Sequence, residues 1–278
     1  RHVKTLVPYL AQQQGLEAIV LMNNPSFRFT GEEIRQRFLG LVRERYKDRH
    51  ALNKAWKGLF ADMKEVEIGW NRVSPRYQDS SAYRYEWQTF HQLLGTEYMA
   101  WMQKLARTAT DKPLTIAFAD SVFTAGEAEY GIDRETLSAT LNLSGICASN
   151  GHKSPYYALD YPGVLPNYAF MKSLAPRSPL VNFDGVLTEG QTPDSPCTGN
   201  YLRTSLWEAA MAGVNAFALR ADVTSLRPDC LEGYASACLD LNRLAPIVTA
   251  FQQAPADVAI FWSMASKIFS NGAPHLSS

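Results

Sequence analysis

The chain has 278 residues, and 46% of them are apolar, which is enough for a domain with a sizeable core. Its 27 Lys and Arg residues balance its 27 Asp and Glu residues, so nucleic acids and anionic membranes, which select a basic excess, gain no support as partners. No apolar run approaches the roughly 18 residues that a transmembrane helix needs.

The first elements along the chain are a strand and a helix. A short apolar run predicts a strand at Ala18–Met22. A helix is expected from about residue 31 to residue 48, because Thr30 followed by Glu33 forms a capping box. This helix would bury an apolar stripe made of Ile34, Phe38, Leu41, Val42 and Tyr46.

Two more helices enclose an insertion. A short helix carries the apolar residues Leu52, Ala55, Trp56, Leu59 and Phe60. Residues 62–81 contain glycine, proline and many charges, and predict an exposed segment. A long helix is expected from residue 82 to residue 109. Its large apolar residues recur at three- and four-residue spacing, which indicates a buried face rather than sugar platforms: Trp87, Phe90, Leu94, Tyr98, Trp101 and Leu105.

Four further strands alternate with helices. The strands are predicted at Leu114–Ala119, Gly145–Ala148, Leu180–Phe183 and Val214–Leu219. The helices between them are expected at Arg134–Asn142, at Leu165–Leu174, and from the Ser195-Pro196 pair to Gly213. Five strands separated by helices imply parallel βαβ units and hence an α/β fold. No dinucleotide fingerprint or P-loop follows any of these strands.

Polar residues follow the predicted strands, where a (β/α)8 barrel keeps its active site. They are Asn23, Asn24, Asp120, Asn150, His152, Asp184 and Arg220. Some have a plainer interpretation, because Asn24 before Pro25 and Asp184 before Gly185 are common openings of a turn. Five strands cannot close such a barrel, so the chain is either part of one or an open sheet.

The four cysteines show neither CxxC pairing nor the Cys/His spacing of a metal site. They are expected to be buried thiols, with a Cys230–Cys238 disulfide as the alternative outside the cytosol. The sequence implies no metal and no organic cofactor.

Residues 16–60 resemble the fourth-strand region of clan A glycoside hydrolases, and most closely that of the family 42 β-galactosidases. A stretch of the form kYgt…LNeaWgt.F in that family is matched by Tyr46, Leu52, Asn53, Ala55, Trp56 and Phe60. Residues 179–190 (PLVNFDGVLTEG) are similar to the seventh strand, and residues 201–223 to the following helix and eighth strand. His152 with Tyr156 is similar to the polar end of the sixth strand.

The resemblance implies a TIM barrel of which residues 1–250 form about strands four to eight, with the first three strands missing. Residues 251–278, which include APADVAIFWS, look like a linker and the start of a second α/β domain. In relatives that domain supports trimer assembly, so a homo-oligomer is one option for this chain.

The same resemblance implies a retaining β-galactosidase mechanism on β-linked glycans, in which two carboxylic groups act. The general acid falls on Asn24 and the nucleophile on Asp184, while Asn23 would bind the sugar 2-hydroxyl. An amide is no useful proton donor, so Asn24 should remove general-acid catalysis, worth about 10²–10⁴-fold. Asp184 keeps the charge of the nucleophile but has a shorter reach.

Several alternatives stay open for this chemistry. Asp120 or Glu189 could replace the missing acid, or Glu189 could be the nucleophile in a shifted register. The chain could also be a degenerate relative, a barrel that binds glycans or serves as a scaffold without cleaving them. In each glycan-binding case, the sugar would be oriented by Asn23, Asp120, Asn150, His152, Tyr156 and Arg220.

Overall fold

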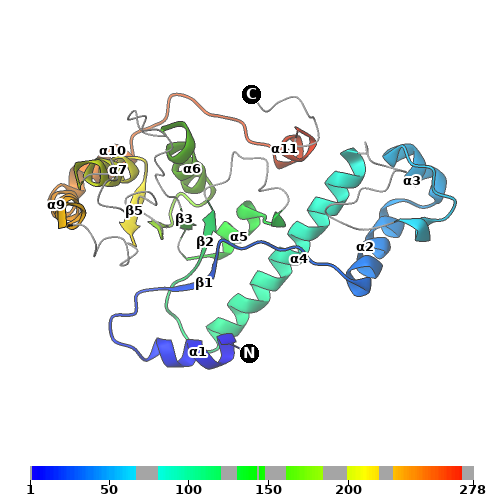
Figure 1. Cartoon of the computed structure of the whole chain (residues 1–278), viewed down its shortest axis with the longest axis horizontal. Coiled ribbons are helices and arrows are strands. Elements are labelled where there is room, and N and C mark those ends of the chain that lie inside the picture. The colour runs from blue at the N-terminus through cyan, green and yellow to red at the C-terminus, as the bar shows by residue number, and fades with distance from the viewer. Residues whose placement is uncertain are drawn as a thin grey trace. The chain divides into compact units, whose positions relative to one another are not determined.

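The computed structural model describes residues 2–66, 81–119, 130–142, 144–147, 161–183, 199–218 and 228–270. Within these ranges, five parallel strands form one sheet in sequence order (Figure 1): β1 (Ile19–Asn23), β2 (Leu114–Ala119), β3 (Ser144–Cys147), β4 (Leu180–Asn182) and β5 (Val214–Phe217). Each strand pairs with the next in parallel. The predicted α/β fold with parallel strands is therefore confirmed.

Helices connect the strands and follow the last one. They are α1 (His2–Ala11), α2 (Glu32–Arg45), α3 (Arg49–Trp56), the short 3-10 helix η1 (Met63–Glu65), α4 (Ser81–Arg107), α5 (Arg134–Thr140), α6 (Tyr161–Leu174), α7 (Gly199–Met211), α9 (Pro228–Arg243), α10 (Ala245–Gln252) and α11 (Met264–Ser270). In the described ranges, none of them combines the length and apolar character that crossing a membrane requires.

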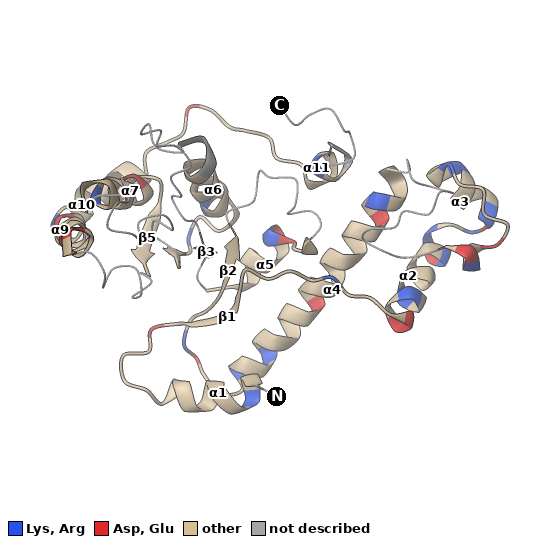
Figure 2. Cartoon of the chain, viewed as in Figure 1, with Lys and Arg blue, Asp and Glu red and all other residues tan. Residues whose placement is uncertain are grey.

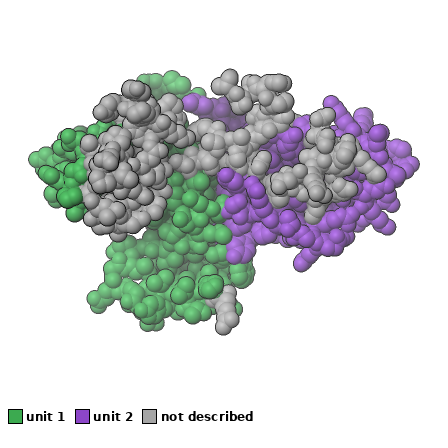
Figure 3. Space-filling model, in the orientation of Figure 1, with its two compact units in different colours: residues 1–25, 101–123, 134–259 green, residues 26–100, 124–133, 260–278 purple. Residues whose placement is uncertain are grey.

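The chain divides into two compact units, which Figure 3 colours separately. Unit 1 comprises residues 1–25, 101–123 and 134–259 and contains the sheet. Unit 2 comprises residues 26–100, 124–133 and 260–278, and α4 contributes residues to both. Acidic and basic residues both occur along α2 and α4, whereas α3 carries only the basic residues Arg49 and Lys54 beside its histidine (Figure 2).

Strand register defines two faces of the sheet in unit 1. Ile19 of β1 pairs with Leu114 of β2, and both pack against Val7 of α1 and Ala106 of α4. This face, covered by helices, is called the outer face. Because successive side chains of a strand alternate between faces, β2 presents three other residues on the opposite, inner face: Thr115, Ala117 and Ala119.

Polar side chains also pack on the outer face. The guanidinium of the buried Arg134, on α5, lies 5.0 Å from the ring of Phe118 and donates a 2.5 Å hydrogen bond to the carbonyl of Ala119. On β4, the buried Asn182 donates from Nδ2 to the hydroxyl of Tyr168 on α6, at 2.8 Å. Helices α5 and α6 thus fix the ends of β2 and β4.

Two glycines bring α7 and α9 into close contact. A Cβ on Gly233 would lie 2.1 Å from the carbonyl oxygen of Gly199, so no larger residue fits without movement. The backbone N–H of Gly199 donates to Asp229 Oδ2 at 3.0 Å, which satisfies one donor at the start of α7. Side chains of the two helices, with Phe217 of β5, then form a shared apolar cluster.

Unit 2 is built around a cluster of aromatic residues. Phe38 of α2 is fully buried, and its ring contacts the rings of Trp56, Tyr83, Trp87 and Phe90 at centroid distances between 5.0 and 6.3 Å. Such ring pairs contribute about 0.5–1.5 kcal/mol each beyond their buried area. The cluster therefore ties α2 and α3 to the first half of α4.

A polar network adjoins this core. The carboxylate of Glu86, which is 5% exposed, accepts hydrogen bonds from Arg45 at 2.5 Å and from the Tyr46 hydroxyl at 2.9 Å. The Tyr46 hydroxyl in turn accepts from Trp56 Nε1 at 3.3 Å. Burial raises the pKa of Tyr46, so this hydroxyl stays protonated and can donate to Glu86.

Three helix predictions need correction. The short helix predicted to carry Leu59 and Phe60 ends at Trp56 as α3, and Leu59 is 85% exposed. Helix α2 begins at Glu32 and its N-cap is Gly31, with a φ of 112° and no side-chain cap, so the capping box built on Thr30 and Glu33 is wrong. On α4, Trp87 and Leu94 are buried as predicted. The core prediction is wrong for two later members of the stripe, which are 39% and 52% exposed: Tyr98 and Trp101. Met99 and Met102 are buried in their place.

Candidate functional site

An irregularity in β1 turns Asn23 toward the inner face. Val20 pairs with Thr115, but Met22 pairs with the next residue of β2, Ile116, so Leu21 is an extra residue in the ladder. Such a bulge reverses which side chains face inward beyond it. Asn23 therefore pairs with Ala117, an inner-face residue, instead of pointing to the helices.

Asn23 meets a thiol from another strand on this face. The Sγ of Cys147, at the end of β3, donates to Asn23 Oδ1 at 2.9 Å. Cys147 pairs with Ala119 of β2, which places it on the inner face as well. Because β2 lies between the two strands, the contact passes over small side chains of β2.

Asn24 has an uncommon backbone conformation. Its φ is 44°, in the left-handed region that few residues other than glycine enter, although asparagine tolerates it better than most. Its backbone N–H donates to the carbonyl of Ala117 at 2.8 Å, which continues the ladder for one more residue. Non-glycine residues with positive φ cluster at functional sites, so this strand end is a candidate.

The inner face carries only small side chains at the middle of the sheet. Ala117 and Ala119 on β2, together with Gly145 on β3, leave little side chain above the backbone. A Cβ on Gly145 would lie 2.3 Å from the carbonyl oxygen of Ile116, so this position accepts only glycine. By the pairing of Val181 with Gly145, the strand β4 presents Val181 and then Phe183 on the same face.

The predicted site residues fall into two groups. Asn23 and Asn24 lie together at the carboxyl end of β1. The remaining candidates lie outside the described residues: Asp120, Asn150, His152, Tyr156, Asp184, Glu189 and Arg220. The strands that lead to them are described, and β1 and β4, which precede positions 24 and 184, belong to one parallel sheet with β2 and β3 between them.

Sequence reasoning did not single out Cys147 or Arg134. Cys147 lies within the predicted strand Gly145–Ala148 and alternates with Ile146, which indicates the face of its own strand but not that Asn23 shares this face. Arg134 carried no such signal, since a charge at the start of a helix is ordinarily solvated. The cysteines in the described ranges, Cys147, Cys230 and Cys238, are thiols and not disulfides, as expected, whereas Cys197 lies outside those ranges.

The resemblance residues of α3 have structural contacts. Asn53 donates from Nδ2 to the carbonyl of Phe60 and accepts from its N–H, both at 2.9 Å, which closes the turn after the helix. Leu52 and Trp56 are fully buried. These contacts give Leu52, Asn53 and Trp56 a structural role that requires no part in catalysis.

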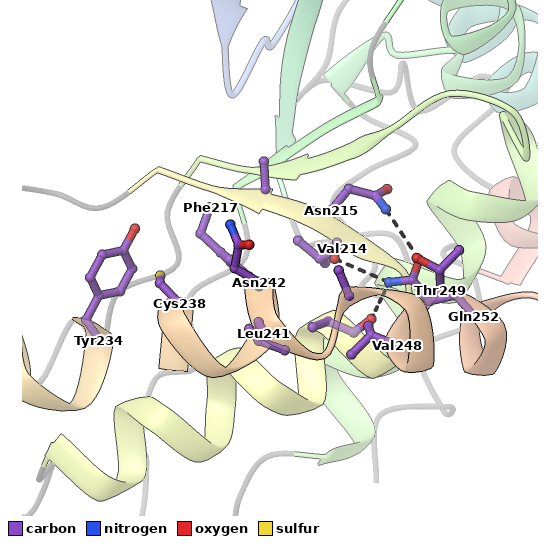
Figure 4. Close-up of a pocket in the computed structure, with 13 residues that line it drawn as sticks. Val214, Asn215, Phe217, Tyr234, Cys238, Leu241, Asn242, Val248, Thr249 and Gln252 are labelled. Carbon is purple, nitrogen blue, oxygen red and sulfur yellow. Dashed lines mark hydrogen bonds between the residues drawn. The ribbon is translucent and has the colours of Figure 1, made fainter. Parts of the chain in front are cut away.

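A separate cavity of about 380 Å³ lies along β5 (Figure 4). Its walls come from β5, α9 and α10, and include Phe217, Tyr234, Leu241 and Val248. Burial, with a smaller effect of Cys238, raises the pKa of Tyr234 to about 12. The lining contains no carboxylate, histidine or predicted site residue, so it lacks the groups that glycoside hydrolysis requires.

In the part of the chain that the structure describes, no three His, Cys, Asp or Glu side chains gather closely enough to hold a metal ion.

Several solved structures of similar fold are glycoside hydrolases. The exo-carrageenase GH42 from Bacteroides ovatus matches with a TM-score of 0.75 and 22% identity over 96% of this chain. A GH42 β-galactosidase from G. stearothermophilus matches with a TM-score of 0.73 and 14% identity over 98%. The fold is part of a (β/α)8 barrel of the family 42 type. The expected family resemblance is thereby confirmed at the level of the fold.

The match covers only part of the compared proteins. This chain spans 41% of the exo-carrageenase and 43% of the β-galactosidase. The catalytic domain of a β-amylase from Paenibacillus polymyxa matches this chain less closely, with a TM-score of 0.56 and 14% identity over 86% of this chain and 66% of its own. No protein-family model and no curated protein sequence matches the chain.

Proposed function

We propose that this chain forms the active-site end of a glycoside hydrolase of β-galactosidase type, which cleaves β-linked glycans with retention. The single observation that carries the proposal is the Asn23-Asn24 pair at the end of β1, where the resemblance places an Asn-Glu pair. The bulge at Leu21 and the positive φ of Asn24 support a functional strand end. The barrel fold shared with family 42 enzymes supports the same assignment.

In this proposal Asp184 attacks the anomeric carbon and forms a glycosyl-enzyme intermediate, which water then hydrolyses. Retaining enzymes hold their two carboxyl groups about 5–5.5 Å apart. Asn24 occupies the acid position, so the leaving oxygen departs without a proton from that residue. Catalysis is then impaired by about 10²–10⁴-fold for leaving groups that need protonation.

Two carboxylates are the candidates for a replacement acid. Asp120 directly follows β2, whose end is held by Arg134, and Glu189 follows Asp184 along the chain. Glu189 also remains the candidate nucleophile if Asp184 serves another role. The sugar itself would be bound through hydrogen bonds from Asn23, Asp120, Asn150, His152, Tyr156 and Arg220.

Hydrolysis of 4-nitrophenyl β-D-galactopyranoside by the 278-residue chain tests the proposal. Nitrophenolate leaves without a proton, so the loss of the acid matters little for this substrate. We expect turnover that releases β-galactose first, as seen by NMR, and that Asp184→Ala abolishes. Asp111→Ala, at the amino-terminal end of β2, is the matched control and should keep full activity. Turnover that Asp184→Ala leaves intact would reject the site.

The second candidate is a barrel that binds glycans without cleaving them. The amide at position 24 favours it, since this residue cannot protonate a leaving group. Titration calorimetry with β-galacto-oligosaccharides distinguishes the two functions. Binding without any product after prolonged incubation would establish the non-catalytic barrel, whereas product formation would establish the hydrolase.

We also propose that residues 1–250 belong to the barrel and that residues 251–278 are a linker and the start of a second α/β domain. Val258, Ile260 and Phe261 are 79%, 90% and 91% exposed. Apolar side chains in such a run suit a strand that becomes covered when further structure packs on it. Homo-oligomer formation through such a domain follows as part of this proposal.

A further inference from the structure

The contact between Asn23 and Cys147 constrains the orientation of an amide in the candidate site. The Cys147 thiol is 7% exposed, while Asn23 is exposed. The distance from Sγ to Oδ1 is 2.9 Å, and the two residues are 124 positions apart in the sequence. The buried Cys147 thiol therefore holds the exposed Asn23 amide at the carboxyl end of the sheet.

Local structure makes this contact available. The bulge at Leu21 turns Asn23 inward, and the register of β3 on β2 turns Cys147 inward. The side chains between them on β2 are Ala117 and Ala119, so nothing large separates the amide from the thiol. A longer residue at either alanine position would block the approach.

The chemistry of the two groups then determines what Asn23 can offer. A carboxamide has one oxygen acceptor and one NH₂ donor on opposite sides. The thiol, a weak donor, occupies the oxygen. The Nδ2 group is therefore directed away from Cys147, and within the described residues it has no hydrogen-bond partner.

We propose that Cys147 is a positioning residue, which holds Asn23 so that Nδ2 donates to an oxygen acceptor of the ligand. This inference rests on the proposed function and specifies it, because the acceptor would be a hydroxyl oxygen of the sugar. In this role Cys147 touches no reacting atom and acts through Asn23. A flipped amide would instead present an oxygen and select a donor.

Substitution of the thiol tests the inference in the full 278-residue chain, with 4-nitrophenyl β-D-galactopyranoside as the probe. Cys147→Ala removes the donor, and we expect galactoside affinity to fall about two- to tenfold, the range for one hydrogen bond. Cys147→Ser restores a donor and should restore most of that affinity. Cys230→Ala removes a buried thiol from the apolar cluster that α7 and α9 share, and should leave galactoside affinity unchanged.

A series of monodeoxy galactosides identifies the hydroxyl that Asn23 binds. In the wild-type chain, removal of that one hydroxyl should weaken binding. In Asn23→Ala the same removal should cost nothing further, because its partner is already lost. In Cys147→Ala, removal of that hydroxyl should weaken binding by less than in wild type and by more than in Asn23→Ala.

Infrared spectroscopy provides a readout that does not depend on any ligand. The difference spectrum between wild type and Cys147→Ser isolates the S–H stretching band of Cys147, which hydrogen bonding shifts to lower frequency. We expect Asn23→Ala to move that band back to higher frequency. A band that does not move would overturn the inference and leave the proposed function standing.

The two proposals fail in different ways. If the wild-type chain binds the galactoside and Cys147→Ala binds it equally well, the positioning role is overturned alone. If the wild-type chain neither binds nor cleaves any galactoside, the proposed function is overturned, and the ligand role of Cys147 falls with it. Loss in Cys147→Ala with rescue in Cys147→Ser supports both.

Discussion

His91 in α4 is held between two backbone carbonyls. Its side chain is fully buried, with Nδ1 at 3.0 Å from the Trp87 oxygen and Nε2 at 2.9 Å from the Phe29 oxygen. A neutral imidazole has only one N–H, so both contacts are hydrogen bonds only in the charged form. Burial is the larger effect and lowers the pKa of His91, while the two carbonyls oppose it.

This lowered pKa makes the stability of unit 2 depend on pH. The unfolded chain takes up a proton at His91 near its ordinary pKa of about 6.5, before the folded chain does. The free energy of unfolding should therefore fall as pH drops below about 6.5, and the contribution is fully present above it. We expect His91→Gln to lose less stability than wild type between about pH 7.5 and pH 5.5, as measured by urea unfolding. Equal losses in the two proteins would contradict this assignment.

Single residues also show where sequence reasoning succeeds. The strand before the two asparagines was predicted, and Asn23 ends β1 with Asn24 directly after it, while their role in a site stays a prediction. The inward direction of Asn23 could not be predicted, because it depends on the bulge at Leu21, and a bulge leaves no pattern in a five-residue strand. The Cys147 contact was missed for the same reason.

Among the helices, two glycines with different surroundings give opposite expectations. Gly233→Ala on α9 would place a Cβ 2.1 Å from a backbone oxygen of α7, and overpacking of this kind costs about 1–3 kcal/mol. Gly40 in α2 is exposed, and a Cβ there would meet nothing within 4 Å. Gly40→Ala should therefore stabilise the protein by about 0.5–1 kcal/mol.

Urea unfolding followed by circular dichroism measures both changes. The midpoint should fall for Gly233→Ala and rise for Gly40→Ala. If Gly233→Ala is as stable as wild type, the close contact between α7 and α9 is not a constraint on the fold.

The same helices explain two differences between expectation and structure. No element was predicted over residues 228–252, where α9 and α10 occur, because their contact positions hold small residues such as Gly233 and Ala237 instead of a large apolar stripe. The start of α2 was misjudged because Gly31 adopts a positive φ and leaves Thr30 outside the helix. Strand positions were predicted within about two residues, since continuous apolar runs bounded by polar residues mark buried parallel strands.

For the whole molecule, the alternation of strands and helices predicted an α/β fold with parallel strands, and the resemblance to family 42 predicted that these strands belong to a TIM barrel. The described sheet has five strands in sequence order, whereas a closed (β/α)8 barrel has eight. In the described residues, β1 and β5 each pair with a single strand, and the cavity of about 380 Å³ lies beside β5. Exposed edges of this kind favour pairing with further strands. The division into two units was not predicted.

The fold also determines which predicted site residues can act together, because parallel strands bring their carboxyl ends to one edge of the sheet. Position 24 follows the first of these strands and position 184 follows the fourth. The proposed impairment of hydrolysis therefore depends on a single substitution in an otherwise barrel-like frame, an amide in place of a carboxylic acid.

The most direct test of whether Asn24 stands in place of the general acid is to replace its amide and to compare two substrates with different leaving groups. Asn24→Glu should raise kcat/KM for methyl β-D-galactopyranoside by about 10²–10⁴-fold, because methoxide needs a proton to leave. The same substitution should change kcat/KM for the nitrophenyl galactoside far less, because nitrophenolate leaves without a proton. Asn24→Gln has the same length without an acid and should give no rise. Equal kcat/KM values for the methyl galactoside in Asn24→Glu and Asn24→Gln would contradict the assignment of position 24 as the lost general acid.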